Sequence, residues 1–225
     1  MARGIRPAGR LTASPPNAPS LARHGGQAWL GLAASLALAA LAGQAAHLDA
    51  FDWQPARAWS EPWRLFSAVA VHYSALHLAA NLAGAGAVAA LGGAARLPPR
   101  CSLAWGLAWP LSQLGLLLQP ALLHYGGWSG VLHAGVAVAG VHLAWRARGT
   151  PRAIGWALLI ALMAKVLSEA PWGPPLRHPA GWDIAIAPLA HATGLLAGLI
   201  CGLVVEVWVA ARAQVRMRRT NALVE

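Results

Sequence analysis

Apolar residues along this chain fall into long stretches that are separated by short polar or charged segments. No Asp, Glu, Lys or Arg lies between Arg64 and Arg96, or between Arg100 and Arg146. About 20 apolar residues make a helix long enough to cross the hydrocarbon core of a bilayer, and Pro120 with the glycines that follow divides the longest stretch into two helices. The pattern predicts an all-α, polytopic membrane protein with six spans, at about 28–46, 74–95, 102–119, 129–145, 153–170 and 183–210.

The composition favours lipid over water as the solvent of this protein. Hydrophobic residues make up 57% of the 225 residues, charged residues make up 11%, and the mean hydropathy is +0.50. A soluble domain carries about 25% charged residues. The loop over 47–68 adds Trp53, Trp59 and Trp63, which suit the headgroup zone of a bilayer.

The net charge of +10 is explained by orientation in the membrane. If both termini are cytoplasmic, 13 of the 17 Lys and Arg residues fall on the cytoplasmic side, as the positive-inside rule requires. The sequence has no base-reading motif and no basic helix, which excludes nucleic acid as the partner. We expect a basic, disordered tail over 1–27, a membrane domain over 28–210 and a basic cytoplasmic tail over 211–225.

The two cysteines indicate neither a disulfide nor a metal site. Cys101 and Cys201 lie in or beside different apolar runs, and no further ligand residues stand at metal-binding spacing around them. We expect reduced, structural thiols and no cofactor.

Ser129 and His191 are the candidate nucleophile and general base of an acyl-transfer site. Ser129 follows a Gly-Gly turn at the start of the fourth span, and His191 lies within the sixth, where an ionisable side chain indicates function. The alternatives are a helix N-cap for Ser129 and a histidine satisfied by a neighbouring carbonyl for His191. Asp183, about two turns away, is poorly placed to complete a triad, so the sequence favours a Ser-His dyad.

A stripe of small residues explains how these two spans approach each other. Gly194, Gly198 and Gly202 recur every four residues on the sixth span, and the fourth span offers Gly130 and Ala134. Small residues allow two helices to pack at short range. This packing is expected to bring the Ser129 hydroxyl toward the His191 ring.

His77 and Asn81 share one face of the second span because they are four residues apart. An Asn amide and a His N–H both donate hydrogen bonds, which an oxyanion hole requires. The alternative is polar contact between helices, a common role of Asn and His in bundles. His72, one turn earlier, either assists the hole or is structural.

Lys165 and Glu169 form a second pair at this spacing, in the outer half of the fifth span. They either neutralise each other within the membrane or recognise the substrate. His133, one turn after Ser129, points the same way as Ser129 and is a candidate for tuning the site.

Taken together, these residues resemble the rhomboid family of intramembrane serine proteases over about residues 28–210. The resemblance rests on four motifs in this order: Glu61-Pro62-Trp63-Arg64, His72-x4-His77-x3-Asn81, Gly127-Trp128-Ser129-Gly130 and His191-x2-Gly194. It implies a six-helix bundle with Ser129 as nucleophile, His191 as base, and His77 and Asn81 in the oxyanion hole. Packing roles are implied for Trp63, Arg64, Gly127, Gly130, Gly194 and Gly198.

Within that family the chain is most similar to the rhombosortase branch, through the Ser129–His133 segment and the Lys165-x3-Glu169 pair. This resemblance implies cleavage, near the outer face of a bacterial inner membrane, of proteins anchored by a C-terminal Gly-Gly motif, an apolar helix and a basic end. The acyl-enzyme permits water or another amine as acceptor. Two other functions stay open: a catalytically silent protein that binds transmembrane helices, and a b-type haem protein with His77 and either His133 or His191 as ligands.

Overall fold

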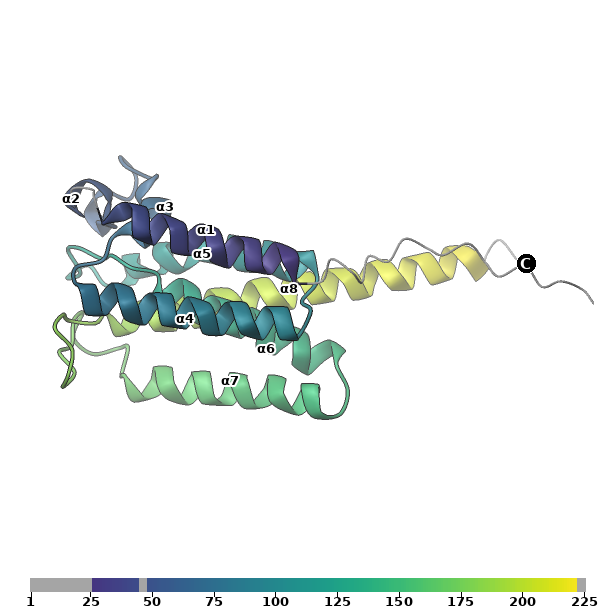
Figure 1. Ribbon diagram of the computed structural model, residues 1–225. Coiled ribbons are helices and arrows are strands. Elements are labelled where there is room, and N and C mark those ends of the chain that lie inside the picture. The colour runs from purple at the N-terminus through teal and green to yellow at the C-terminus, as the bar shows by residue number, and fades with distance from the viewer. Residues whose placement is uncertain (1–25, 45–47, 222–225) are drawn as a thin grey trace, which may run out of the picture.

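A computed structural model describes residues 26–44 and 48–221, and helices are the only regular elements that these residues form (Figure 1). The long helices are α1 (Gln27–Gly43), α4 (Ala75–Ala94), α5 (Pro99–Leu114), α6 (Ser129–Arg146), α7 (Thr150–Ser168) and α8 (Pro188–Asn221). The short ones are α2 (Leu48–Phe51), η2 (Pro55–Arg57), α3 (Arg64–Ser67), η3 (Ala68–Ala70) and η4 (Gly115–Leu118). The described residues form no β-strand, and residues 1–25 of the predicted basic tail lie outside them.

Four helices in the described part of the chain are long and apolar enough to cross a membrane: α4, α5 with η4, α7 and α8. Helix α1 is apolar but shorter. Many large apolar side chains of these helices point outward, among them Leu103, Ile160 and Val204, as expected of surfaces that face lipid. The fold is therefore an all-helical bundle of membrane-protein character, and the count of six spans stays a prediction.

Helix α6 is the central helix of the bundle, packed against α4, α5, α7 and α8. Its buried residues are mainly Gly, Ala and Val and lie around its whole circumference; they include Gly135, Ala137 and Gly140. A helix enclosed by other helices touches little lipid, so it needs small side chains more than uniformly high hydropathy. This position explains why α6 is not among the four helices that qualify by composition.

The predicted start of the last span was wrong, and the helix that contains this span is longer than the predicted span. Helix α8 begins at Pro188 rather than at Asp183, and it continues unbroken through Asn221, beyond the predicted start of a tail at 211. Proline is favoured in the first turn of a helix, and the segment 170–187 before it is a loop. His191 therefore lies in the first turn of α8, not two turns into a span.

The loop between α1 and α4 is held by a buried charge cluster around Asp52. The Arg64 guanidinium donates to the Asp52 carbonyl at 2.8 Å and to its carboxylate at 3.2 Å, and also to Glu61. These contacts fit the structural role expected of Arg64, and the Arg64 hydrogen bond holds the pKa of the Glu61 carboxyl below its usual range. The neighbouring Trp63 is half-exposed, and its packing role stays a prediction.

Trp53 also departs from its prediction, because it is fully buried instead of lying in a headgroup zone. Its backbone exchanges two hydrogen bonds with Tyr125, at 2.7 and 2.8 Å. Tyr125 precedes the Gly126-Gly127 turn that leads into α6. The first loop therefore fixes the position from which Ser129 enters its helix.

Candidate active site

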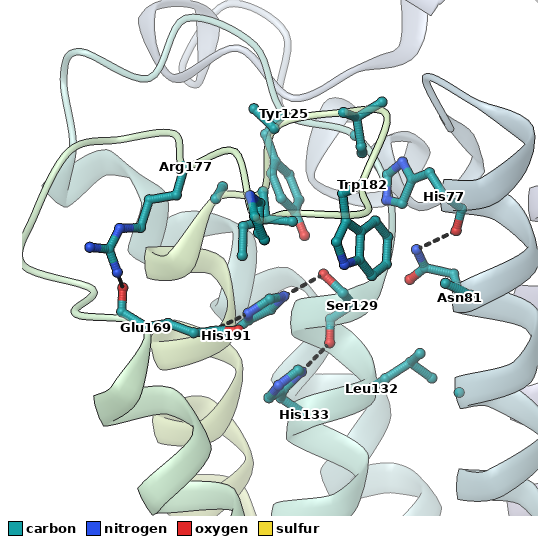
Figure 2. A pocket seen from close by; sticks show the side chains of 18 of the residues that line it. His77, Asn81, Tyr125, Ser129, Leu132, His133, Glu169, Arg177, Trp182 and His191 are labelled. Atoms are coloured by element: carbon teal, nitrogen blue, oxygen red, sulfur yellow. Dashed lines mark hydrogen bonds and ion pairs between the residues drawn. The ribbon is translucent and has the colours of Figure 1, made fainter.

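Ser129 and His191 meet at the same end of the bundle, each in the first turn of its helix (Figure 2). The Ser129 Oγ lies 2.9 Å from Nε2 of His191, and the His191 side chain is buried. Helix α6 begins at Ser129 itself, and no side chain caps its N-terminus. The alternative role of Ser129 as an N-cap is therefore wrong, and its hydroxyl is available to the imidazole.

The close approach of α6 and α8 that the glycine stripe predicted is confirmed. A Cβ atom added at Gly194 would lie 2.0 Å from the Gly130 carbonyl oxygen, and one at Gly198 would lie 2.4 Å from that of Ala134. In the opposite direction, a Cβ at Gly130 would lie 2.6 Å from the Ala190 carbonyl oxygen. Backbone contacts therefore set the separation of the two helices, and with it the Ser129–His191 distance.

Replacing Gly194 by alanine is expected to lower both stability and activity, because the new methyl group meets rigid backbone that cannot move aside. Overpacking of this kind costs about 1–3 kcal/mol. The matched control is Gly86→Ala on α4, where an added Cβ has no neighbour within 4 Å. Thermal unfolding in detergent compares the two variants, and equal melting temperatures would contradict the account of the α6–α8 contact.

The Glu169 carboxylate contacts the second nitrogen of the His191 ring, Nδ1. The sequence did not predict this contact. Glu169 Oε2 lies 2.6 Å from His191 Nδ1, and its Oε1 lies 3.0 Å from Lys165 Nζ. The ion pair expected between Lys165 and Glu169 is present. The expectation that no carboxylate stands in reach of the base is wrong, because α7 packs against α6 and α8 and ends beside His191.

His133 also contacts both His191 and Lys165. Its ring stacks on that of His191, with centroids 4.3 Å apart and planes inclined by 11°. Its Nδ1 lies 2.6 Å from the Ser129 carbonyl oxygen, and its Nε2 lies 2.7 Å from Lys165 Nζ. His133 thus contacts the serine, the base and the lysine together, as a residue that tunes the site would.

His77 and Asn81 face the site from α4, across the cavity from Ser129 and His191 (Figure 2). The Asn81 amide donates one hydrogen bond to the His77 carbonyl at 2.9 Å, which leaves its second N–H available. Gly127 lies against His77, since a Cβ there would be 2.6 Å from His77 Nε2, and its φ of +98° strongly favours glycine. The structure brings both predicted donors to the wall of the site.

His72 lies behind His77, with ring centroids 4.8 Å apart, and does not line the cavity that contains Ser129. Burial lowers the pKa of His72, which favours a neutral imidazole. Of its two predicted roles, the structural one fits this position.

Tyr125 is a site residue that the sequence analysis missed. Its side chain is buried in the loop before α6, and its hydroxyl contacts the Ser129 side chain and the Gly130 backbone. Burial raises the pKa of Tyr125, although those hydrogen bonds act in the opposite direction. No sequence motif marks it, because its position depends on the backbone pairing with Trp53.

All of the polar site residues described above except His72 line one cavity of about 1080 Å³. The cavity lies between α4, α6, α7 and the loop before α8. Its upper part contains Ser129, His191, His77 and the Trp182 ring of that loop (Figure 2). Its lower part is apolar and follows α4 as far as Val88, about 10 Å below Asn81. The Ser74 hydroxyl at the start of α4 donates to Asp183 at 2.8 Å. This hydrogen bond connects the loop before α8 to α4 at the edge of the cavity.

The described residues group metal-type ligands at one place, at the end of the bundle opposite Ser129. Cys101, His142 and Glu206 bring one ligand atom each within 4.8 Å of one another. Arg146 donates to the Glu206 carboxylate at 2.5 Å, and Arg100 lies 3.5 Å from it. Two guanidinium groups already neutralise this carboxylate, so the cluster fits a structural ion pair between α5, α6 and α8 better than a cation site.

Comparison of the chain with models of protein families, with curated proteins and with solved structures found no match.

Proposed function

We propose that this chain is an intramembrane serine endopeptidase of the rhomboid type, with Ser129 as nucleophile and His191 as general base. The observation that carries the proposal is the 2.9 Å contact between the Ser129 hydroxyl and His191 Nε2, in a cavity that also exposes His77 and Asn81. A nucleophile in reach of a base, whose second nitrogen is held by another group, is the arrangement that acyl transfer requires. The ordered motifs of the sequence support the same activity.

The reaction follows from these positions. Ser129 Oγ attacks the peptide carbonyl carbon while His191 Nε2 takes the hydroxyl proton. Negative charge develops on the carbonyl oxygen, where N–H groups of His77 and Asn81 stabilise it. The C–N bond then breaks, and His191 returns the proton to the leaving amine. Water, activated by the same imidazole, hydrolyses the ester and restores the Ser129 hydroxyl.

The substrate in this proposal is a protein anchored by a C-terminal transmembrane helix. The lower, apolar part of the cavity suits a hydrophobic segment, and its polar upper part, which contains Ser129, suits the scissile bond. With both termini in the cytoplasm, the positive-inside rule puts the Ser129 end of the bundle at the outer face of the inner membrane. The resemblance to rhombosortases adds a Gly-Gly motif and a basic end to the substrate.

The test is cleavage of such a substrate in proteoliposomes. The purified protein is reconstituted with a reporter that carries Gly-Gly, an apolar helix and a basic end, and the product is mapped by mass spectrometry. We expect one cut, close to the Gly-Gly motif, and a slower cut in a reporter with Val-Val at that place. An intact reporter that still binds the protein would favour a catalytically silent, helix-binding protein.

The haem alternative fits the geometry less well. The second ligand would be His133 or His191, and both ring nitrogens of each of these residues already contact protein groups, which leaves neither ring a free nitrogen for iron. A Soret band in the absorption spectrum of the purified protein would support the haem alternative.

A further inference from the structure

Glu169 lies at the C-terminal end of α7, where its carboxylate contacts both the candidate base, His191, and the Lys165 ammonium. One carboxylate oxygen lies 2.6 Å from His191 Nδ1, and the other lies 3.0 Å from the Lys165 ammonium. The Arg177 guanidinium donates to the Glu169 backbone carbonyl at 2.8 Å, which fixes the end of the helix. Glu169 is largely buried, with 19% of its side chain exposed, so its carboxylate is held in a defined place.

A count of donors and acceptors assigns the protons around His191. The ionised Glu169 only accepts hydrogen bonds, so His191 Nδ1 carries the proton and Nε2 presents its lone pair to the Ser129 hydroxyl. Lys165 then donates to Glu169 and to His133 Nε2, while its 3.0 Å approach to His191 Nδ1 is proximity without donation. His133 Nδ1–H donates to the Ser129 carbonyl. Both ring nitrogens of His133 and of His191, and both carboxylate oxygens of Glu169, have a partner in this arrangement.

We infer that Glu169 is the orienting carboxylate of a Ser129–His191–Glu169 triad, and that Lys165 holds it in place. This inference rests on the proposed function, and it replaces the dyad expected from the sequence. Glu169 is a positioning residue, because it acts on the substrate only through His191. It holds the tautomer in which Nε2 accepts the serine proton, and it stabilises the imidazolium that forms in the transition state.

Lys165 explains how a carboxylate persists in this place. A lone charge in a low-dielectric region is costly unless a counter-ion accompanies it. The Lys165 ammonium supplies that counter-ion and also contacts His133, whose ring stacks on the base. The charged and titratable groups that face His191 are thus His77 from α4, His133 from α6, and Lys165 and Glu169 from α7.

The test separates orientation of the base from recognition of the substrate. Glu169→Gln removes the charge and keeps the shape, and Glu169→Asp keeps the charge with a shorter reach. Ser35→Ala on α1 is the control, because its exposed hydroxyl donates to the Leu32 carbonyl at 2.8 Å and does not line the cavity. Each variant is assayed for kcat and KM on the reporter, and for the rate at which a small fluorophosphonate labels Ser129. Circular dichroism and thermal unfolding establish that each variant is folded.

We expect Glu169→Gln to lower kcat and the labelling rate by about 10²–10⁴-fold with little change in KM, since neutralising the orienting carboxylate of a soluble serine protease costs about 10⁴ in kcat. Glu169→Asp should recover part of the loss, and Ser35→Ala should match the wild type. The small probe carries no Gly-Gly segment. A folded Glu169→Gln variant that labels at the wild-type rate, or that only raises KM, would overturn the triad in favour of recognition or packing.

A double variant guards against misfolding of the single one. Lys165→Met with Glu169→Leu leaves neither charge unpaired, so it should be folded while labelling as slowly as Glu169→Gln. Normal labelling by this variant would also overturn the inference. If the wild type itself neither cleaves the reporter nor labels at Ser129, the proposed function fails, which is a different outcome from a wild type that is active without needing Glu169.

Discussion

Replacing Ser129 by alanine is expected to abolish cleavage of the membrane-anchored reporter while the protein stays folded and inserted. The hydroxyl oxygen is the atom that forms the acyl-enzyme, and neither water nor a neighbouring side chain replaces it at 2.9 Å from His191 Nε2. The loss of stability should be small, on the order of 1 kcal/mol, because Ser129 does not cap α6 and loses mainly its hydrogen bonds to side chains. Product formation is measured over time in proteoliposomes.

A matched control for this variant is Ser112→Ala on α5. The Ser112 hydroxyl is buried and donates to the Trp109 carbonyl at 2.7 Å, away from the cavity. It should cleave at nearly the wild-type rate. Substantial turnover by Ser129→Ala would remove Ser129 from the chemistry and leave its contact with His191 as a structural hydrogen bond.

Replacing Asn81 by alanine is expected to lower kcat by about 10²–10³-fold with a much smaller effect on KM. A donor in an oxyanion hole binds the charge that develops in the transition state more strongly than the neutral carbonyl of the substrate. Asn81 is buried in the wall of the cavity, and only one of its amide protons is used by the His77 carbonyl. Steady-state kinetics on the reporter separate the two constants.

Gln44 provides a close control for Asn81. It is also an amide side chain that donates to a backbone carbonyl four residues earlier, that of Ala40 at 3.4 Å, but it lies away from the large cavity. Gln44→Ala should leave kcat unchanged. If Asn81→Ala instead raises KM at constant kcat, Asn81 recognises the ground state and the oxyanion hole lies elsewhere.

The sequence was sufficient for what depends on local spacing. Charge-free stretches predicted the long helices, and the four-residue repeat of Gly194 and Gly198 predicted the close contact with α6. That contact in turn predicted the meeting of Ser129 and His191. Each of these inferences needs only helical geometry and the size of side chains.

The contacts that the sequence did not predict depend on loop conformation and on the packing of α7 against α6 and α8. Glu169 was placed correctly next to Lys165 because four residues make one helical turn, but its contact with His191 needs the position of α7 against α8. Asp183 was expected in the last span, about two turns from the base, because that span was predicted to start five residues early; it lies instead in the loop before α8. Tyr125 reaches Ser129 through a backbone pairing with Trp53, which no periodicity indicates.

The central claim is that His191 activates Ser129 as a nucleophile, and covalent labelling tests it most directly. In the reaction with a fluorophosphonate, the Ser129 oxygen forms a bond to phosphorus, fluoride leaves, and His191 accepts the hydroxyl proton. Intact-protein and peptide mass spectrometry should find one adduct on Ser129 of the wild type and none on His191→Ala under the same conditions. A wild-type protein that remains unlabelled at Ser129, or a His191→Ala variant that labels equally fast, would contradict the account.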